Sequence, residues 1–354
     1  MDFLIMKVLN KHHLKTLGPT DVYVGRGSGL GNPYRMDVFR EDRGLVVNLH
    51  RRDFLNNLAN MKSQTKALFS IPMESNLVCY CHPLACHADV YKEFREKTVG
   101  MTYKEARKYF LALNSFKFLP ELEGITHINI YSRSSTQLGR LTSNFTHSPF
   151  EHPDHGWFES MEGYWFWLSS GMVHEEFRKL HGLEAKSKGG RLKKVFNPDF
   201  EWFIERGCQA KVDNNPELKK LLSENHLPFR HYYFYGQPDN CSCVLEDGLL
   251  NRIYAKISQN LGESFDVLIT GAESVKNPDL ITKKVLESGI RIKTIYELGG
   301  KGVDAFINYY GKRNYIPVVT TTIEELPKEV TKAIVFQDES PEFQTLLEKL
   351  KKLC

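Results

Sequence analysis

The sequence has no apolar run that approaches the roughly 18 residues needed to cross a bilayer. Its first residues, MDFLIMKVLNKHH, lack a convincing hydrophobic segment and cleavage site of a signal peptide. Cysteine is scarce, because a chain of 354 residues carries only seven, an odd number. These absences argue against a membrane protein and a disulfide scaffold and favour a reducing compartment, so we expect a cytoplasmic protein with no membrane partner.

The sequence also lacks internal repeats, low-complexity segments and a strong excess of one charge. The net charge of +4 is too small to indicate nucleic-acid binding by itself. Hydrophobic and charged contents of 41% and 25% are typical of a globular protein that folds throughout. Because 354 residues exceed one compact core of ordinary size, we expect two or three domains.

The C-terminal third alternates short apolar segments with segments of helical character. We expect strands at 265–270, 292–296, 316–319 and 333–336, and helices at 278–288, from 303 onward and at 341–353. This alternation predicts a parallel sheet with crossover helices, and hence a Rossmann-like, doubly wound domain.

Ligands of such sheets bind beyond the carboxyl ends of the strands. Gly271 follows the first expected strand, and a glycine-rich turn after the second contains Gly300, Gly302 and Asp304. The turn opens a helix whose backbone amides can hold a phosphate. We predict these four residues as ligand-binding, with a purely structural role for the domain as the alternative.

The segment from Ile128 to Trp167 combines an Asn-Phe pair, Asn144 and Phe145, with one isolated carboxylate, Glu162, and many aromatic residues. Large flat rings can stack on a heterocycle, and a carboxylate among them loses enough water for its pKa to rise, which suits an acid or a base. A ligand pocket is one interpretation. The other is the core of a middle domain with Glu162 at its rim.

The strongest basic run of the chain lies further on, from Lys186 to Lys194, and includes Arg191. Its five cations in nine residues surround a Gly-Gly pair. This composition suits a phosphate, a pyrophosphate or a nucleic-acid backbone. A solvated loop explains the run equally well.

Near the N-terminus, an expected strand at 22–24 leads into a loop that has four glycines in seven residues, from Gly25 to Gly31, followed by Asn32. Such a loop lets backbone amides approach an anion, and Arg26 can add a fork of donors. The spacing matches neither the dinucleotide-binding nor the P-loop pattern, so a plain turn is the competing interpretation.

A second cluster in this block contains Cys79, Cys81, Cys86 and His87. A buried strand would place the first two cysteines on one face, with the third and the histidine at the start of the next helix. Three interpretations are open: a zinc site, an activated thiolate and buried structural cysteines. The C-x-C spacing departs from the C-x2-C pairs of structural zinc sites.

Five motifs of the middle segment carry a resemblance to a known family: Tyr131-Ser132, Leu141 to Phe150, Ser160 to Glu162, Gly182 to Lys186 with Arg191, and Phe200 to Leu222. Together they resemble the NADAR superfamily over about residues 126 to 236. The resemblance implies an N-glycosidase fold that binds a ribosylated or ADP-ribosylated base and cleaves the bond between base and ribose.

The same resemblance implies roles for single residues. Glu162 would act as general base or stabilise the ribosyl cation, and Asn144 would fix the ribose. The ligand-binding residues would be Phe145, Trp157, Tyr164 and Trp165, of which the last three stack the base, and Lys186 and Arg191, which neutralise phosphates. No cofactor is required.

Two further resemblances cover the ends of the chain. The motifs V-Y-V-G-R, G-N-P-Y and C-Y-C-x-P-x-x-C-H, within residues 17 to 95, resemble a small, poorly characterised domain family of bacteria and their viruses. It implies that Arg26 and Asn32 face one pocket with the Cys-His cluster. T-G-A and G-G-K-G-V-D, within about residues 262 to 340, are similar to the SLOG superfamily, which implies a nucleotide ligand held by the glycines and Asp304.

We therefore expect an α/β and α+β multidomain protein with a small α/β domain over 1–100, a helix-rich NADAR-like domain over 101–240 and a Rossmann-like domain over 241–354. The predicted function is an N-glycosidase acting on a nucleotide or ADP-ribose-like molecule, free or in nucleic acid, in the host cytoplasm if the gene belongs to a phage. A homo-oligomer is compatible with the sequence.

Two other functions stay open. A protein that binds or sequesters a nucleotide-derived ligand is favoured by Ser169-Ser170, which stand where NADAR proteins usually have a lysine, and by 231–236, which replace an Asp and a Trp-Gly pair. A nucleic-acid modification protein is the third, with the basic loop holding a strand.

Overall fold

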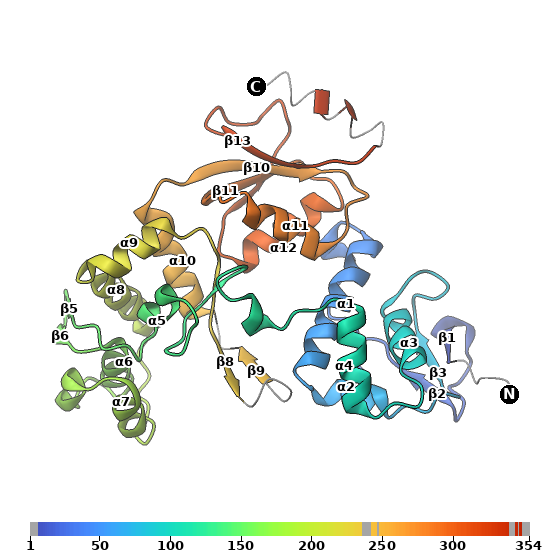
Figure 1. Cartoon of the computed structure of the whole chain (residues 1–354), viewed down its shortest axis with the longest axis horizontal. Coiled ribbons are helices and arrows are strands. Elements are labelled where there is room, and N and C mark those ends of the chain that lie inside the picture. The colour runs from blue at the N-terminus through green and yellow to red at the C-terminus, as the bar shows by residue number, and fades with distance from the viewer. Residues whose placement is uncertain (1–5, 236–241, 246–247, 340–343, 346, 349–354) are drawn as a thin grey trace.

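The computed structural model describes residues 6–235, 242–245, 248–339, 344–345 and 347–348, and its elements form three bodies (Figure 1). The N-terminal body lies at the lower right of that view, the middle body at the lower left and the C-terminal body above both. The mixed α/β multidomain fold predicted from the sequence is confirmed. Within the described residues, no helix combines the length and the apolarity needed to span a bilayer.

The N-terminal body is built on a three-stranded parallel sheet in which β3 (Asn76–Cys79) lies between β1 (Lys7–Asn10) and β2 (Asp21–Tyr23). Leu77 and Val78 of the central strand are fully buried because both faces of the sheet are covered. The helices of this body are α1 (Arg43–Ala59), α2 (Ser63–Phe69), α3 (His87–Lys97) and α4 (Tyr103–Leu113), with short 3-10 helices η1 (Lys11–His13) and η2 (Asp37–Phe39).

The middle body is mainly helical. Its elements are η3 (Leu119–Leu122), α5 (Gln137–Thr142), α6 (Met161–Ser169), η4 (Glu175–Lys179), α7 (Gly182–Gly189), α8 (Phe200–Asp213), α9 (Pro216–Glu224) and α10 (Leu249–Leu261). Three strand pairs complete it: parallel β4 (Ile128–Asn129) with β7 (Phe229–Arg230), antiparallel β5 (Phe150–His152) with β6 (Gly156–Phe158), and antiparallel β8 (Tyr232–Tyr235) with β9 (Ser242–Leu245).

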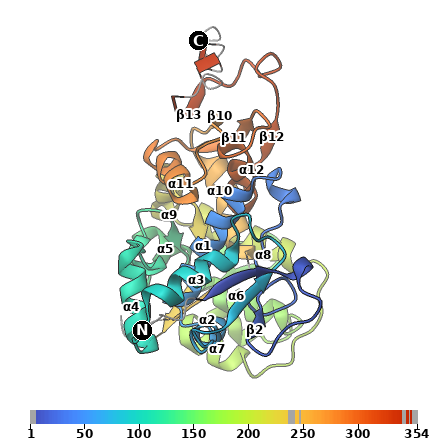
Figure 2. The ribbon, with the colours of Figure 1, turned by 90° about the vertical axis from the view of Figure 1, so that its right-hand side faces the viewer.

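The C-terminal body contains a four-stranded parallel sheet in the order β12-β11-β10-β13. The strands are β10 (Phe265–Gly271), β11 (Ile292–Glu297), β12 (Val318–Thr320) and β13 (Lys332–Phe336), and the crossover helices are α11 (Pro278–Glu287) and α12 (Val303–Arg313). Both helices lie on the side of the sheet that faces the other two bodies (Figure 2). The helix expected at 341–353 lies mostly outside the described residues.

Two predicted domain boundaries differ from the cores that the structure forms. Ala106 and Phe110 of α4 pack in the N-terminal core, which therefore extends past residue 100. Four buried residues of α10, Leu250, Ile253, Tyr254 and Ile257, pack in the middle core, which therefore extends past residue 240. Each helix carries an apolar stripe, and the stripe joins the core that it can cover.

Helix α1 belongs to two cores. Phe54, Leu55 and Leu58 pack in the N-terminal body, whereas Leu45 and Leu49, nearer its start, pack in the C-terminal core. The helix therefore ties the two bodies together, and its first turns contact α11.

Candidate functional site

The geometry around Glu162 is set by the start of α6. Ser160 caps the helix, since its Oγ accepts a hydrogen bond from the Gly163 amide (3.0 Å) and donates one to the Leu180 carbonyl (2.8 Å). The backbone N–H of Glu162 donates to the carbonyl of Asn144 (2.9 Å). The two residues predicted as catalytic are thus joined through the backbone, although they come from separate elements.

The Glu162 side chain is only 8% exposed. Burial raises the pKa of its carboxyl to about 7, and nearby Lys186 opposes that rise. The predicted increase of this pKa is confirmed. A carboxyl that titrates near neutral pH can take up or release a proton under ordinary conditions, which is what general acid-base chemistry needs.

Lys186 connects this carboxyl to two aromatic rings. Its ammonium lies 5.2 Å from the ring centroid of Phe145 and 5.3 Å from that of Tyr233, within cation-π distance of both. Tyr233 comes from β8 and meets Tyr131 edge to face at 5.4 Å. The structure therefore brings together Glu162, the Asn144 backbone, Phe145 and Lys186, and adds Tyr233, which was not among the predicted site residues.

Lys211 is a second addition to this region. It is fully buried in α8, its Nζ donates to the carbonyl of Ser143 (2.9 Å), and burial lowers its pKa to about 8. The residue after Ser143 is Asn144, whose buried Oδ1 has no hydrogen-bond partner among the described residues. The sequence does contain a sign that Lys211 is buried. It follows Ile204 by seven residues and Cys208 by three, which places this lysine on the apolar stripe of α8.

The three predicted stacking residues have other partners within the protein. Tyr164 is fully buried, and its ring packs against His152 and Phe158, so it offers no face to a ligand in this structure. Trp157 is half exposed, and its Nε1 donates to Glu159 (3.3 Å).

Trp165, the third predicted stacking residue, packs edge to face on Phe200 at 4.8 Å. Arg191 lies beyond the end of α7 and is exposed, whereas Lys186 is inside that helix. The base-stacking prediction for these tryptophans and Tyr164 stays a prediction, because aromatic composition does not say which side of a helix or hairpin faces a pocket. Phe145 and Tyr233 present the rings that lie beside Glu162 and Lys186.

The glycine-rich turn of the C-terminal body already holds an anionic group. The amide of Gly302 donates to the carboxylate of Asp42 (2.9 Å), which comes from the N-terminal body. Arg40, two residues earlier, donates to the Gly300 carbonyl (2.7 Å) and to both oxygens of buried Glu297 (2.6 and 2.9 Å). A side chain of the same chain therefore stands where we predicted a phosphate.

Asp304 of this turn and Gly271 at the end of β10 have local structural partners. Asp304 is buried, its Oδ2 accepts from the amides of Gly300 (2.9 Å) and Leu298 (3.2 Å), and burial raises its pKa to about 6. Gly271 allows close packing, because a Cβ there would lie 2.5 Å from the Cβ of Phe336. These contacts give each residue a structural role, whereas the Oδ1 of Asp304 is buried without a hydrogen-bond partner among the described residues.

The predicted anion loop of the N-terminal body is also engaged internally. The Arg26 side chain is exposed, and the backbone carbonyl of Arg26 accepts a hydrogen bond from the Tyr23 hydroxyl (3.1 Å). Asn32 is buried and its Oδ1 accepts from the amide of Tyr34 (2.9 Å), which forms a local turn.

The Cys-His cluster is compact. The Sγ atoms of Cys79 and Cys86 lie 3.3 Å apart, and a ring nitrogen of His87 lies 2.7 Å from the Val24 carbonyl. Among the described residues, no group of three or more His, Cys, Asp or Glu side chains has the geometry to hold a metal ion. A hydrogen bond with Cys79 lowers the pKa of Cys86, yet both thiols are buried, so access to a substrate is restricted.

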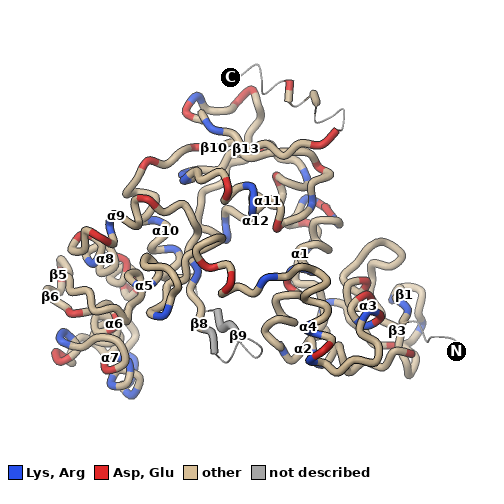
Figure 3. Tube along the Cα trace, in the orientation of Figure 1, with Lys and Arg blue, Asp and Glu red and all other residues tan. Residues whose placement is uncertain are grey.

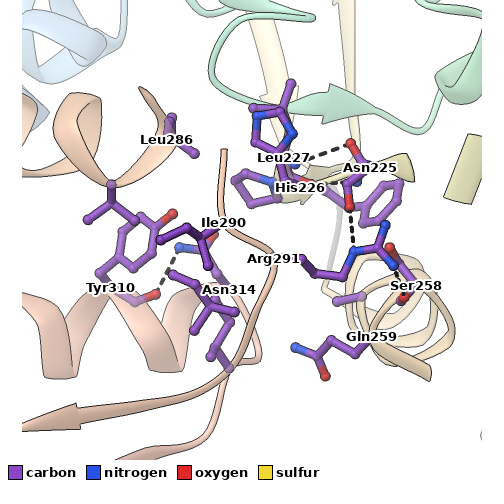
Figure 4. A pocket seen from close by; sticks show the side chains of 16 residues that line it. Asn225, His226, Leu227, Ser258, Gln259, Leu286, Ile290, Arg291, Tyr310 and Asn314 are labelled. Carbon is purple, nitrogen blue, oxygen red and sulfur yellow. Dashed lines mark hydrogen bonds between the residues drawn. The ribbon is translucent and has the colours of Figure 1, made fainter. Parts of the chain in front are cut away.

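A cavity of about 60 Å³ lies between the middle and C-terminal bodies (Figure 4). Arg291 in its wall donates to the carbonyls of Asn225 (3.1 Å), Ser258 (3.3 Å) and Leu222 (3.3 Å). The volume corresponds to about two waters, at about 30 Å³ each. The Arg291 guanidinium in its wall is already bound to backbone carbonyls, so we interpret this cavity as part of the interface between the middle and C-terminal bodies. No predicted catalytic residue lines it.

In comparisons with known proteins, residues 8–97 match the model of a family described as Domain of unknown function (DUF4326). The match runs from β1 through α3 and covers about a quarter of the chain. No curated protein and no solved structure matches the chain. The expectation that this block is a small domain of a poorly characterised family is thus supported, and the match assigns no reaction.

Proposed function

We propose that the chain is an N-glycosidase that hydrolyses the bond between base and ribose in a ribosylated or ADP-ribosylated base. The site would be the middle body around Glu162. The observation that carries the proposal is a buried carboxyl with a pKa of about 7 beside a cation and two aromatic faces. The resemblance to the NADAR superfamily supports the substrate class.

In the proposed reaction the C–N bond to the base breaks and an oxocarbenium-like ribosyl cation develops. Glu162, as carboxylate, stabilises this cation and accepts a proton from the attacking water, whose oxygen joins the anomeric carbon. The base leaves with the electron pair of the broken bond and takes up a proton from solvent, and Glu162 then releases the proton that it accepted from water. Phe145 and Tyr233 offer ring faces to the base or ribose, and the exposed ammonium of Lys186 suits a phosphate oxygen.

The runner-up function is binding without turnover. Ser170 stands where the resembling family usually has a lysine, and its Oγ donates to the Phe166 carbonyl (2.7 Å), so it serves the end of α6 rather than chemistry. Under this alternative the middle body retains a nucleotide-derived ligand, and the SLOG-like C-terminal body binds a second one only after Asp42 leaves the amide of Gly302.

Nucleic-acid binding is the third proposal. Lys and Arg positions gather at the end of α7 (Figure 3), where Arg191, Lys193 and Lys194 are exposed. Binding through this patch would weaken steeply as the salt concentration rises. Elsewhere in Figure 3 the two signs of charge are interspersed.

The proposed activity is tested by mass spectrometry after incubation of the full chain with NAD, ADP-ribose, ribosylamino-pyrimidines and DNA that carries ADP-ribosylated guanine. Release of a free base by the wild type and its loss in Glu162→Gln would support hydrolysis. Glu184→Gln, at an exposed carboxylate of α7, is the matched control and should keep full activity. Retention of an unchanged ligand by all three proteins would favour the binding alternative.

A further inference from the structure

A separate cavity of about 180 Å³ lies inside the N-terminal body. Its walls are the glycine-rich loop at Gly29 and Gly31, one face of α1, the start of α2 and Tyr91 of α3. An engineered cavity of about 150 Å³ binds benzene, so this one is large enough for a single small ring system.

The face of α1 that lines this cavity has the spacing of a core stripe but not its composition. His50, Asp53, Phe54 and Asn57 follow one another at intervals of three, one and three residues, which places them on one side of the helix. A stripe at this spacing that packs on a core is normally apolar. Here three of the four side chains are polar, so the helix presents hydrogen-bonding groups to an internal space.

His50 is the strongest sign that something belongs in this space. Its side chain is 4% exposed, and neither Nδ1 nor Nε2 has a hydrogen-bond partner among the described residues. Burial and the nearby His87 lower its pKa to about 3, so the ring is neutral and carries one N–H donor and one acceptor. A buried polar atom without a partner destabilises a fold, because it has lost its hydrogen bonds to water and gained none in return.

The walls are held in place by hydrogen bonds and close packing among the lining residues and their neighbours. The Tyr91 hydroxyl donates to the Leu30 carbonyl (2.8 Å), which fixes the loop. Gly31 packs so closely that a Cβ would lie 2.8 Å from the Cα of Arg26. Thr65 shares a 2.7 Å hydrogen bond with the hydroxyl of Tyr103. The cavity is thus a formed site.

The charges of the lining decide which ligands fit. No lysine or arginine is among the described residues that line the cavity, which makes a phosphate a poor ligand in spite of the glycine-rich loop. The Asp53 carboxylate, which also interacts with the Tyr34 hydroxyl, accepts hydrogen bonds. The Asn57 amide and neutral His50 each donate and accept. This set matches an uncharged ring that carries N–H donors beside ring acceptors.

We infer that the N-terminal body binds a nucleobase-like heterocycle in this cavity, with His50, Asp53 and Asn57 on its polar edge and Phe54 on its apolar side. The inference concerns a second site and does not depend on the proposed glycosidase. It gives the loop that we expected to hold an anion a different role, as a backbone wall against a flat neutral ring.

The test uses the full chain carrying Glu162→Gln, so that the middle body cannot consume a probe. Cytosine, guanine, uracil and inorganic phosphate are titrated separately, and binding is followed by ligand-observed NMR. We expect at least one base to bind and phosphate not to. Asn57→Leu should weaken base binding at least tenfold, whereas Asn56→Leu, its neighbour outside the cavity lining, should leave it unchanged.

His50→Phe gives a second, opposite readout. It keeps a ring against His87 and Tyr91 but removes both unpartnered nitrogens, so it should raise the Tm of the free protein while weakening base binding at least tenfold. If this variant does not fold, Asn57→Leu alone decides. The inference is overturned if no base binds at millimolar concentration, if phosphate binds instead, or if Asn57→Leu binds the bases as tightly as Asn56→Leu.

Discussion

At the residue scale, Glu162 links the stability of the middle body to its proposed chemistry. The folded protein raises the pKa of this carboxyl from 4.5 to about 7 because it is buried. The folded state therefore holds the proton more tightly than the unfolded state does. The resulting stabilisation is complete below pH 4.5 and is lost as the pH rises through 7.

Glu162→Gln should therefore stabilise the protein in alkaline solution. The amide is neutral at every pH, so the variant avoids burying a charge above pH 7. The expected gain at pH 8 is of the order of 3 kcal/mol, from about 1.4 kcal/mol per pKa unit. Urea unfolding of both proteins at pH 5 and pH 8 measures it. An equal difference at both values would contradict the raised pKa.

Lys211→Met should impair turnover more than it changes stability. The substitution removes the donor to the Ser143 carbonyl and so loosens the backbone that leads to Asn144, which we expect to lower kcat at least tenfold. Removal of a buried charge offsets much of the lost hydrogen bond, so the free energy of unfolding should change by less than about 2 kcal/mol. Lys219→Met on α9, an exposed site, is the control, and a kcat equal to that of this control would refute the positioning role.

Residue types singled out Glu162 among aromatic residues and Lys186 in a basic run, but the roles proposed for Glu162, Asn144, Phe145 and Lys186 came from the resemblance to the NADAR superfamily. They could not identify Tyr233, which lies in a run of similar aromatic residues and is placed by long-range contacts of β8, such as the hydrogen bonds between the Asn129 side chain and the Tyr232 backbone. They could not identify His50 either, because its unpartnered ring nitrogens become visible only in the folded structure.

At the element scale, the start of α6 determines where the Glu162 carboxyl lies. The Ser160 hydroxyl both caps the helix and bonds to the Leu180 carbonyl, so it fixes the helix end against the segment before α7. Gly163 completes this joint, because a Cβ there would lie 2.3 Å from the carbonyl oxygen of Phe177.

Ser160→Ala should lower both stability and activity. Loss of the cap destabilises by about 1 kcal/mol, and the unpaired Leu180 carbonyl adds to it. Asn277→Ala removes the cap of α11 in the C-terminal body and serves as the matched control. Thermal unfolding should show a similar loss for both, but kcat should fall only for Ser160→Ala; equal kcat values would show that this helix end does not position Glu162.

Elements with a strong period were predictable. The strands and crossover helices of the C-terminal body follow the predicted alternation, because buried parallel strands must be short apolar runs. The pairing of β4 with β7 was not predictable, because each strand has only two residues and so shows no period.

At the scale of the whole molecule, the loop before α1 joins the N-terminal and C-terminal bodies. Glu297 is fully buried and depends on Arg40 for its charge partner. Despite burial, hydrogen bonds from Arg40 and Thr320 hold the pKa of Glu297 below 4.5. Its stabilising effect is therefore present above pH 4.5 and is lost as the pH falls through the lowered value.

Arg40→Gln should uncouple the two bodies. It leaves Glu297 buried without its cation, which we expect to destabilise by the order of 3 kcal/mol and to separate one unfolding transition into two. Arg35→Gln removes an exposed ion pair with Asp37 from the same loop and should change stability by less than about 1 kcal/mol. Calorimetry of both variants tests this, and a single unshifted transition for Arg40→Gln would contradict the proposed joint.

The borders of the three bodies could not be predicted from composition, because long-range contacts decide which core each helix joins. Helix α1 divides its apolar residues between two cores, and Arg40 meets a partner 257 positions away. Such contacts depend on how the complete bodies are arranged, and a local pattern of residues does not predict that arrangement.

The central claim, hydrolysis at Glu162, is tested most directly by running the reaction with the same substrate panel in water enriched in ¹⁸O. Mass spectrometry should find a free base without label and a ribosyl product with one ¹⁸O atom, from the wild type and Glu184→Gln but not from Glu162→Gln. Absence of free base from every substrate, or undiminished release by Glu162→Gln, would contradict the account.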